Sequence, residues 1–267
     1  MSDAGPEGGN PLRNSLWNLL YRIVSSTDRS GTAWGAILRG SRLGFFKEAI
    51  DELPASDNEA SRRAMKRSFF ELPDDRVYDL YEFLLRDDRA GLKEVDRKLL
   101  RRSLNGVLED EGAPVRLLRD RFVPLQDHLG LDALASAEKG VSLFGLDAAG
   151  RHLQSAVELL AARTSGSPAE AVREAVLAVA AVVRTLSGES GPVAIGTIAP
   201  AADRLGMPAA LRDAVDGVLD RCRAAGGFPP GETGGPAIDL PDASFLVVFC
   251  SGVIHLLLAR SGGESPE

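Results

Sequence analysis

Apolar residues recur with the 3.6-residue period of an amphipathic helix along most of the chain. In the first half this pattern predicts helices at 12–26, 45–53, 57–70, 73–85 and 92–108. The second of these should end before Pro54, because a residue that precedes proline disfavours the helical conformation. The segment 27–44 is rich in Gly and Ser and supports no assignment.

One segment departs from the helical period. Two short apolar runs, 115–118 and 122–125, flank the polar sequence Arg119-Asp120-Arg121. Short β-prone runs separated by a tight polar turn are typical of a β-hairpin. The sequence therefore predicts a small hairpin at this point.

The remainder of the chain again follows the helical period. Asp147 is expected to cap one helix, and Ser167-Pro168-Ala169-Glu170 is a capping box with proline at the first helical position. Gly188 should end that second helix. A third helix spans 211–222 and should end at Gly226, a loop rich in Gly and Pro follows at 228–241, and an apolar helix at 243–259 closes the fold.

These elements predict a mainly α protein with two domains. The first, at 11–140, is a helical N-terminal domain that contains the small β-hairpin. The second, at 141–260, is a bundle of four main helices. Residues 1–10 are expected to form a disordered tail, and 261–267 a second tail.

Composition narrows the possible partners. The net charge of −7 gives no overall attraction to polyanions, so any nucleic-acid surface would have to be a local basic patch. Cys222 and Cys250 lie inside apolar helical patterns and are interpreted as buried small side chains rather than as a disulfide or zinc site. Asp and Glu clusters stand at helix ends, and no metal or cofactor is expected.

Location is predicted from two segments. The first ten residues lack the charged-then-apolar pattern of a signal peptide, which predicts a cytoplasmic protein. The apolar segment 243–259 is at the short limit for a membrane span and includes Ser244, Ser251 and His255. A buried core helix, with no membrane contact, is the favoured interpretation.

Several segments, in their order, resemble the AbiJ group of bacterial abortive-infection (phage-defence) proteins. The N-terminal half resembles one of that group's variable domains through SLWNLLYRIV, FFKEAIDELP and FFELPDDRVYDLYEFLL, followed by LNGVLEDEGAPVRLLRDRFVPL. The C-terminal half resembles the group's HEPN-like domain through HLQSAVELLAARTSGSPAEAVREAVLAVAAVVRTLSG, MPAALRDAVDGVLDRC and ASFLVVFCSGVIHLL.

This resemblance implies a four-helix HEPN bundle that forms homodimers. Many HEPN domains are metal-independent ribonucleases whose Arg and His meet across the dimer interface. His supplies an acid or base near neutral pH, and Arg stabilises the charge that develops at phosphorus. No cofactor is implied.

The loop that should contain these two residues lacks both. Relatives typically have a Gly-x-Arg-His run before the last helix, whereas this chain has Gly234-Gly235-Pro236-Ala237-Ile238-Asp239. Ala180 stands where the family has a glutamate, although Glu174 is present earlier in that helix. The sequence therefore favours a phage-defence protein with a degenerate, non-catalytic HEPN-like domain used for dimerisation or sensing.

Two alternatives remain open. The chain could be a ribonuclease toxin with displaced catalytic residues, for which His152, Arg151 and Arg184 are the candidates. It could also be an antitoxin or scaffold partner of a neighbouring effector. His128 has a suitable spacing from Arg121 but lies in the wrong domain, and His255 is expected to be a hydrogen-bonded core histidine.

Two basic groups lie on predicted N-terminal helices. Such groups are usually solvated helix faces, and the alternative is an RNA- or phosphate-binding surface. The first group is Arg62, Arg63, Lys66 and Arg67, and the second is Arg97, Lys98, Arg101 and Arg102.

Overall fold

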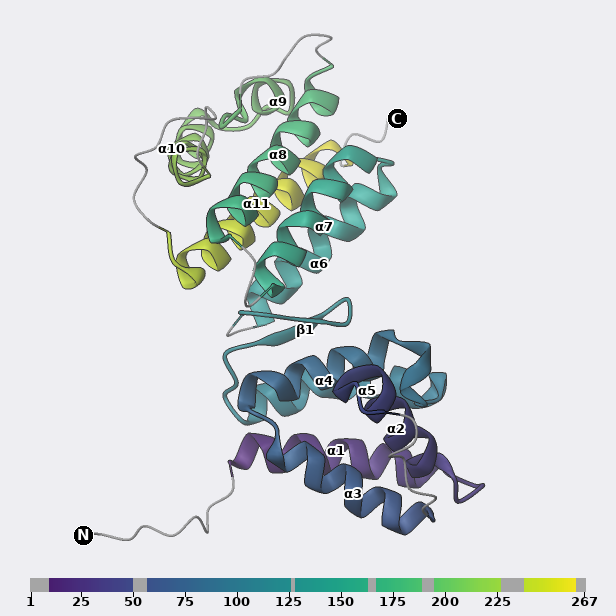
Figure 1. Cartoon of the computed structure of the whole chain (residues 1–267). Helices are drawn as coiled ribbons and strands as arrows, with labels where there is room; N and C mark the ends of the chain where they lie inside the picture. The colour runs from purple at the N-terminus through teal and green to yellow at the C-terminus, as the bar shows by residue number, and fades with distance from the viewer. Residues whose placement is uncertain are drawn as a thin grey trace, which may run out of the picture. The chain divides into compact units, whose positions relative to one another are not determined.

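A computed structural model describes residues 10–49, 57–125, 128–162, 167–188, 195–226 and 238–262 (Figure 1). These residues form a mainly α protein with one two-stranded antiparallel hairpin, which confirms the predicted fold class. The chain divides into two compact units, Met1–Phe122 and Val123–Glu267. Both predicted tails, except for the residues at 10, 261 and 262, lie outside the described residues.

The predicted domain boundary near residue 140 falls inside helix α6 (His128–Leu143), which belongs to the second unit. The boundary is displaced because α6 packs against the last helix, α11 (Leu240–Ser261). Gly140 allows this close approach, since a Cβ there would lie 2.8 Å from Cδ1 of Leu258. The amphipathic pattern of α6 is weak, so the sequence did not predict that it packs against α11.

The first unit contains five α-helices within its described residues, and the predicted helices at 12–26, 57–70, 73–85 and 92–108 are all present. Their bounds are α1 Pro11–Thr27, α2 Ala33–Ser41, α3 Asn58–Glu71, α4 Asp74–Arg86 and α5 Glu94–Asp110. A π-helical turn, η1 (Arg42–Phe46), extends α2, and a 3-10 turn, η3 (Asp88–Ala90), follows α4.

The predicted helix at 45–53 is wrong for residues 47–49. Lys47 adopts a left-handed conformation with φ of 60° and ends the π-helical turn. Residues 50–53 lie outside the described part of the chain. Helix α2 occupies the preceding segment, for which the sequence supported no assignment, and Trp34 and Ile37 anchor it in the core.

The core of the first unit is aromatic. Trp17 packs against Trp34 and Phe69, with ring centroids 5.5 and 5.4 Å apart. Tyr81 is fully buried beside Phe69, and its hydroxyl donates a hydrogen bond of 2.6 Å to the Leu16 carbonyl. This bond satisfies a hydroxyl that would otherwise be buried without a partner.

The predicted hairpin is confirmed, with strands β1 (Arg116–Leu118) and β2 (Arg121–Val123). Arg119 and Asp120 form its turn with φ of 49° and 62°. Two successive positive φ values are typical of a type I′ turn, whose twist matches that of the strands. Glycine or asparagine usually occupies these positions, so this turn needs support from elsewhere in the structure.

The second unit contains the four predicted main helices, and α6 and α9 join them there. Within its described residues this unit therefore contains two helices more than the predicted bundle of four. The bounds after α6 are α7 Asp147–Ala161, α8 Pro168–Ser187, α9 Ala199–Arg204, α10 Ala209–Ala225 and α11. Helix α8 packs against α7, α10 and α11 (Figure 1).

The helix ends agree in part with the predicted caps. Ser167 accepts a hydrogen bond of 3.3 Å from the Glu170 amide, and Gly188 ends α8 with φ of 69°. Asp147 is not a cap but the first residue of α7. The loop predicted to extend to 241 ends earlier, because Asp239 caps α11 and accepts a hydrogen bond of 2.9 Å from the Asp242 amide.

Helix α11 is long and apolar enough to cross a membrane by length and composition, but 56% of its most apolar window is buried inside the protein. Its buried residues face α6, α7 and α8. Cys250 on α11 and Cys222 on α10 are free thiols with no exposed surface, so the predicted burial of both is confirmed.

Candidate functional site

The C-terminal unit contains one polar pair at the position where the sequence suggested chemistry. His152 on α7 and Glu174 on α8 share a hydrogen bond of 2.7 Å between Nδ1 and Oε2. The side chains are 35% and 26% exposed. A carboxylate that bonds to one ring nitrogen fixes the orientation of the imidazole and leaves Nε2 as the nitrogen available for acid–base chemistry.

The other two candidate catalytic residues do not join this pair. Arg151 precedes His152 on α7, and adjacent helical residues point about 100° apart. Arg184 lies ten residues beyond Glu174 on α8, which corresponds to a rise of about 15 Å. Both arginines are exposed. Within one chain, the structure thus brings His152 to Glu174 but not to Arg184.

The remaining histidines do not supply a second site. His255 is exposed on α11, so the expectation of a buried core histidine is wrong. It lies on the one face of α11 that the other described helices leave uncovered. His128 is exposed in the first turn of α6, and Arg121 is in strand β2 of the other unit. Most of the loop at 234–239 lies outside the described residues.

The first basic group lies on α3 and is partly used within the unit. Arg62 forms an ion pair with Glu59, and its guanidinium lies 5.5 Å from the centroid of the Tyr21 ring. Lys66 lies over the Phe70 ring at 5.7 Å. Arg63 and Arg67 are exposed. The exposed basic surface of α3 therefore consists of Arg63, Lys66 and Arg67.

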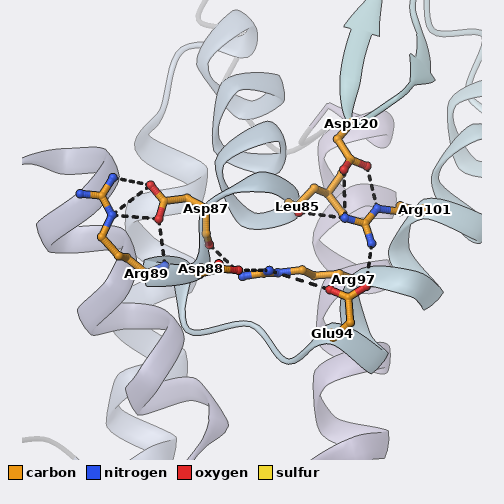
Figure 2. A network of polar contacts seen from close by, with 8 residues as sticks. All are labelled: Leu85, Asp87, Asp88, Arg89, Glu94, Arg97, Arg101 and Asp120. Atoms are coloured by element: carbon orange, nitrogen blue, oxygen red, sulfur yellow. Dashed lines mark hydrogen bonds and ion pairs between the residues drawn. The ribbon is translucent and has the colours of Figure 1, made fainter.

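The second basic group has a structural role at two of its four positions. Arg97 is 7% exposed, and its Nη atoms donate to the Asp88 carboxylate and the Asp87 carbonyl at 2.7 and 2.8 Å (Figure 2). Arg101 binds the Asp120 carboxylate and also donates to the Leu85 carbonyl at 3.0 Å. The favoured interpretation of this group as a solvated helix face is therefore wrong at Arg97, and both Arg97 and Arg101 instead hold the end of α4.

Sequence patterning missed a surface on α11. Seven residues with little charge repeat with helical spacing along its least buried side: Phe245, Val248, Phe249, Gly252, His255, Leu256 and Ala259. Phe245, His255 and Ala259 are exposed, and the other four are half-buried. We call this set the α11 stripe. Phe245 is 64% exposed, which is unusual for a large aromatic side chain. The uniformly apolar sequence of 243–259 indicated burial on all sides and so concealed this exposed face.

The described residues contain no group of three or more His, Cys, Asp or Glu side chains placed to hold a metal ion. No protein-family model matches the chain, and no curated protein or solved structure is significantly similar to it.

Proposed function

We propose that this chain is a non-catalytic phage-defence scaffold of the abortive-infection type, whose C-terminal unit associates with a second copy through the α11 stripe. The assignment to phage defence rests on the segments that resemble the AbiJ group. The mode of association rests chiefly on one observation, the partly exposed apolar face of α11 with Phe245 at 64% exposure. Contiguous exposed apolar surface commonly marks an interaction site.

The composition of the stripe favours a second copy of the same chain. Among its residues only His255 can become charged, so the partner surface needs no complementary charges. A two-fold axis that passes near the middle of α11 would place each stripe against its equivalent. Phe245, Phe249 and Leu256 would then become buried, as large apolar side chains at the centre of interfaces commonly are.

Gly252, near the centre of the stripe, supplies a second argument. A Cβ added at Gly252 would meet nothing within 4 Å, so packing within the chain does not require glycine here. Glycine inside a helix costs about 0.5–1 kcal/mol relative to alanine. The close approach of a second backbone would account for a glycine at this position.

A scaffold role is supported by the sequence of the loop in which the resemblance would place the catalytic residues. Arg184 lies about 15 Å along α8 from the glutamate that holds His152. The loop sequence at 234–239 also lacks both Arg and His. Within the described part of one chain Arg184 does not reach His152, so RNA cleavage by these residues would require an Arg from the second copy across the interface.

The mode of association is tested by sedimentation of the full chain and two charge-introducing variants. Phe245→Glu should convert a dimer into a monomer, because it would bury an unpaired charge at the interface. Leu211→Glu is the matched control, since Leu211 is also an exposed apolar residue of this unit but lies on α10. A monomeric unmodified chain at micromolar concentration would contradict the proposal, and so would equal effects of the two variants.

The His152–Glu174 pair supports a second candidate function, metal-independent RNA cleavage. A carboxylate-oriented imidazole is a competent general base. Incubation of total RNA with the chain, in the presence of a chelator, tests this function. Cleavage that disappears in His152→Ala and persists in His128→Ala would establish it. RNA that stays intact with the unmodified chain and with both variants would contradict this second function and favour the scaffold.

A further inference from the structure

The N-terminal unit contains a cavity of about 770 Å³ that neither the sequence motifs nor the proposed self-association uses. Its walls come from the π-helical turn η1, helix α4, the segment after α4 and strand β2. The hollow is broad and largely open to solvent, and its volume falls within the range typical of pockets for small molecules. The cavity lies entirely within one unit, so its geometry does not depend on any partner.

Four guanidinium groups line this cavity although the whole chain has a net charge of −7. Arg121 donates from Nη1 to Glu82 at 2.7 Å, and Arg89 forms an ion pair with Asp87. Each arginine has five N–H donors, and these carboxylates use only some of them. The paired acids therefore orient the arginines and leave other donors available.

Arg86 is the one lining arginine that forms no ion pair or side-chain hydrogen bond within the described part of the chain, and it is exposed. An unpaired guanidinium binds an anion without first losing an internal partner. Lys47 adds a further positive charge beside Asp87, whose pKa is held at about 2 chiefly by its hydrogen bonds from Arg89. The lining contains four carboxylates as well as four arginines, and each carboxylate is paired with an arginine: Asp79 with Arg76, Glu82 with Arg121, Asp87 with Arg89 and Asp88 with Arg97. The positive charge that remains unpaired among the described lining residues is that of Arg86.

The segment that contributes Asp87 and Arg89 to the cavity is fixed from behind. Figure 2 shows Arg97 reaching the carbonyl of Asp87 and the carboxylate of Asp88, so both residues after α4 are held by one guanidinium. Glycines also seat this segment against α2, since a Cβ at Gly40 would lie 2.1 Å from the Arg89 carbonyl oxygen. A ligand would thus meet a preorganised wall, which lowers the entropic cost of binding.

The same cavity offers two aromatic rings. Phe45 in η1 and Phe83 in α4 both line it, are half-buried, and have ring centroids 5.9 Å apart. The Arg76 guanidinium lies 4.8 Å from the Phe45 ring centroid. π-Helical turns are rare and occur often at functional sites. Here the turn places Phe45 at the cavity wall, and it ends at left-handed Lys47.

We propose that this cavity binds a nucleoside phosphate, with the phosphate bound by Arg86, Arg89 and Arg121 and the base held against Phe45 and Phe83. Arginine favours phosphate because its planar donors match the phosphate oxygens. Aromatic side chains stack on bases of any sequence. The ligand is a free nucleotide or the terminal nucleotide of an RNA chain, and both present this chemistry.

Calorimetric titration of the full chain at low salt tests this proposal. The ligands are the four nucleoside monophosphates, the four nucleosides, inorganic phosphate and a short 5′-phosphorylated oligoribonucleotide. At least one monophosphate should bind saturably, and about tenfold more tightly than its nucleoside or inorganic phosphate. Tighter binding of the oligoribonucleotide would identify an RNA end as the ligand, and weaker binding would identify a free nucleotide.

Three variants locate the site. Arg86→Ala should weaken nucleotide binding about tenfold and lower Tm only slightly, because within the described part of the chain it breaks no ion pair and removes only a favourable charge in the last turn of α4. Arg102→Ala is the matched control, since Arg102 is exposed on α5 and does not line the cavity. Phe45→Leu should weaken binding of the nucleotide and leave the weak binding of inorganic phosphate unchanged.

Several results would overturn the proposal: no saturable binding of any nucleotide, inorganic phosphate binding as tightly as nucleotides, or equal affinity of Arg86→Ala and Arg102→Ala. This inference goes beyond the proposed scaffold function and is independent of it, because the sedimentation experiment concerns the other unit. A monomeric chain that binds nucleotides would contradict the scaffold proposal alone. A dimer that binds no nucleotide would contradict this inference alone.

Discussion

Arg101 on α5 binds both carboxylate oxygens of Asp120 in the hairpin turn, with Nε–Oδ1 and Nη2–Oδ2 distances of 2.7 and 2.9 Å. Asp120 is one of the two turn residues with positive φ. A bidentate guanidinium–carboxylate pair constrains both distance and orientation. This pair therefore holds a non-glycine type I′ turn in a conformation that the two turn residues alone disfavour.

Replacing this arginine should loosen the hairpin. Arg101→Ala removes the two bonds to Asp120, the bond to the Leu85 carbonyl and the exposed bond to Glu94. We expect it to lower the free energy of unfolding by about 1–2 kcal/mol after allowance for partial exposure. Urea denaturation measures the change. Arg102→Ala, at the exposed neighbouring position, should shift it by less than about 0.5 kcal/mol. Equal effects would show that the ion pair does not support the turn.

Asp28 links stability to acid pH. Its carboxylate accepts hydrogen bonds from the amides of Ala33 and Thr32 at 3.1 and 3.3 Å. Desolvation raises its pKa, but these backbone bonds and bonds from Ser30 and Asn58 outweigh that effect and lower the pKa. Asp28 thus stabilises the fold above the unfolded pKa of about 4, and this contribution is lost as the pH falls through the lower folded value.

Asp28→Asn should therefore be less stable than the unmodified chain at pH 7 by about 0.3–1 kcal/mol, because asparagine keeps one acceptor oxygen but loses the negative charge beside the N-terminus of α2. The difference should shrink when both proteins are denatured by urea at pH 2 to 3. A difference that is equal at the two pH values would mean that the charge of Asp28 does not contribute.

Tyr81 links stability to alkaline pH. Burial raises its pKa, because the phenolate would be desolvated beside the Leu16 carbonyl. Its contribution is complete below the unfolded pKa of about 10 and is lost as the pH rises above that value. Tyr81→Phe should lower the free energy of unfolding by about 1 kcal/mol at pH 7. Between pH 9 and 11, this variant should lose less stability than the unmodified chain. Equal losses of stability in the two proteins between pH 9 and 11 would show that Tyr81 is not the source of the alkaline pH dependence.

The sequence predicted most helices and the hairpin because their signals are local. Ser167, Pro168 and Gly188 indicated the ends of α8, and the break in period at Arg119-Asp120 indicated the turn. Long-range contacts were not predictable in this way. The packing of α6 against α11 depends on Gly140 meeting Leu258, and the ion pair that holds the turn joins Arg101 to Asp120.

The candidate site was predictable only in part. His152 was identified, and Glu174 was noted in its own helix, but their hydrogen bond joins two helices and has no sequence signature. Arg97 and Arg101 have the same spacing as solvated cations, and only the structure shows that they bind the carbonyls at the end of α4. The α11 stripe was hidden because its exposed and buried residues are equally apolar.

The central claim is that the α11 stripe meets a second copy, and Gly252→Ala tests it most directly. This substitution should stabilise α11 within each chain by about 0.5–1 kcal/mol, since the new Cβ meets nothing within 4 Å. It should also weaken the dimer, because the same Cβ would separate two closely packed backbones. Gly217→Ala, at an equally open glycine in α10, is the control and should stabilise the fold without affecting association.

The decisive measurement is the mass of Gly252→Ala by sedimentation across micromolar concentrations, beside that of the unmodified chain and Gly217→Ala. We expect Gly252→Ala to dissociate into monomers at a higher protein concentration than the unmodified chain, and Gly217→Ala to behave like the unmodified chain. Unchanged association of Gly252→Ala, or a single-chain mass for all three proteins, would contradict it.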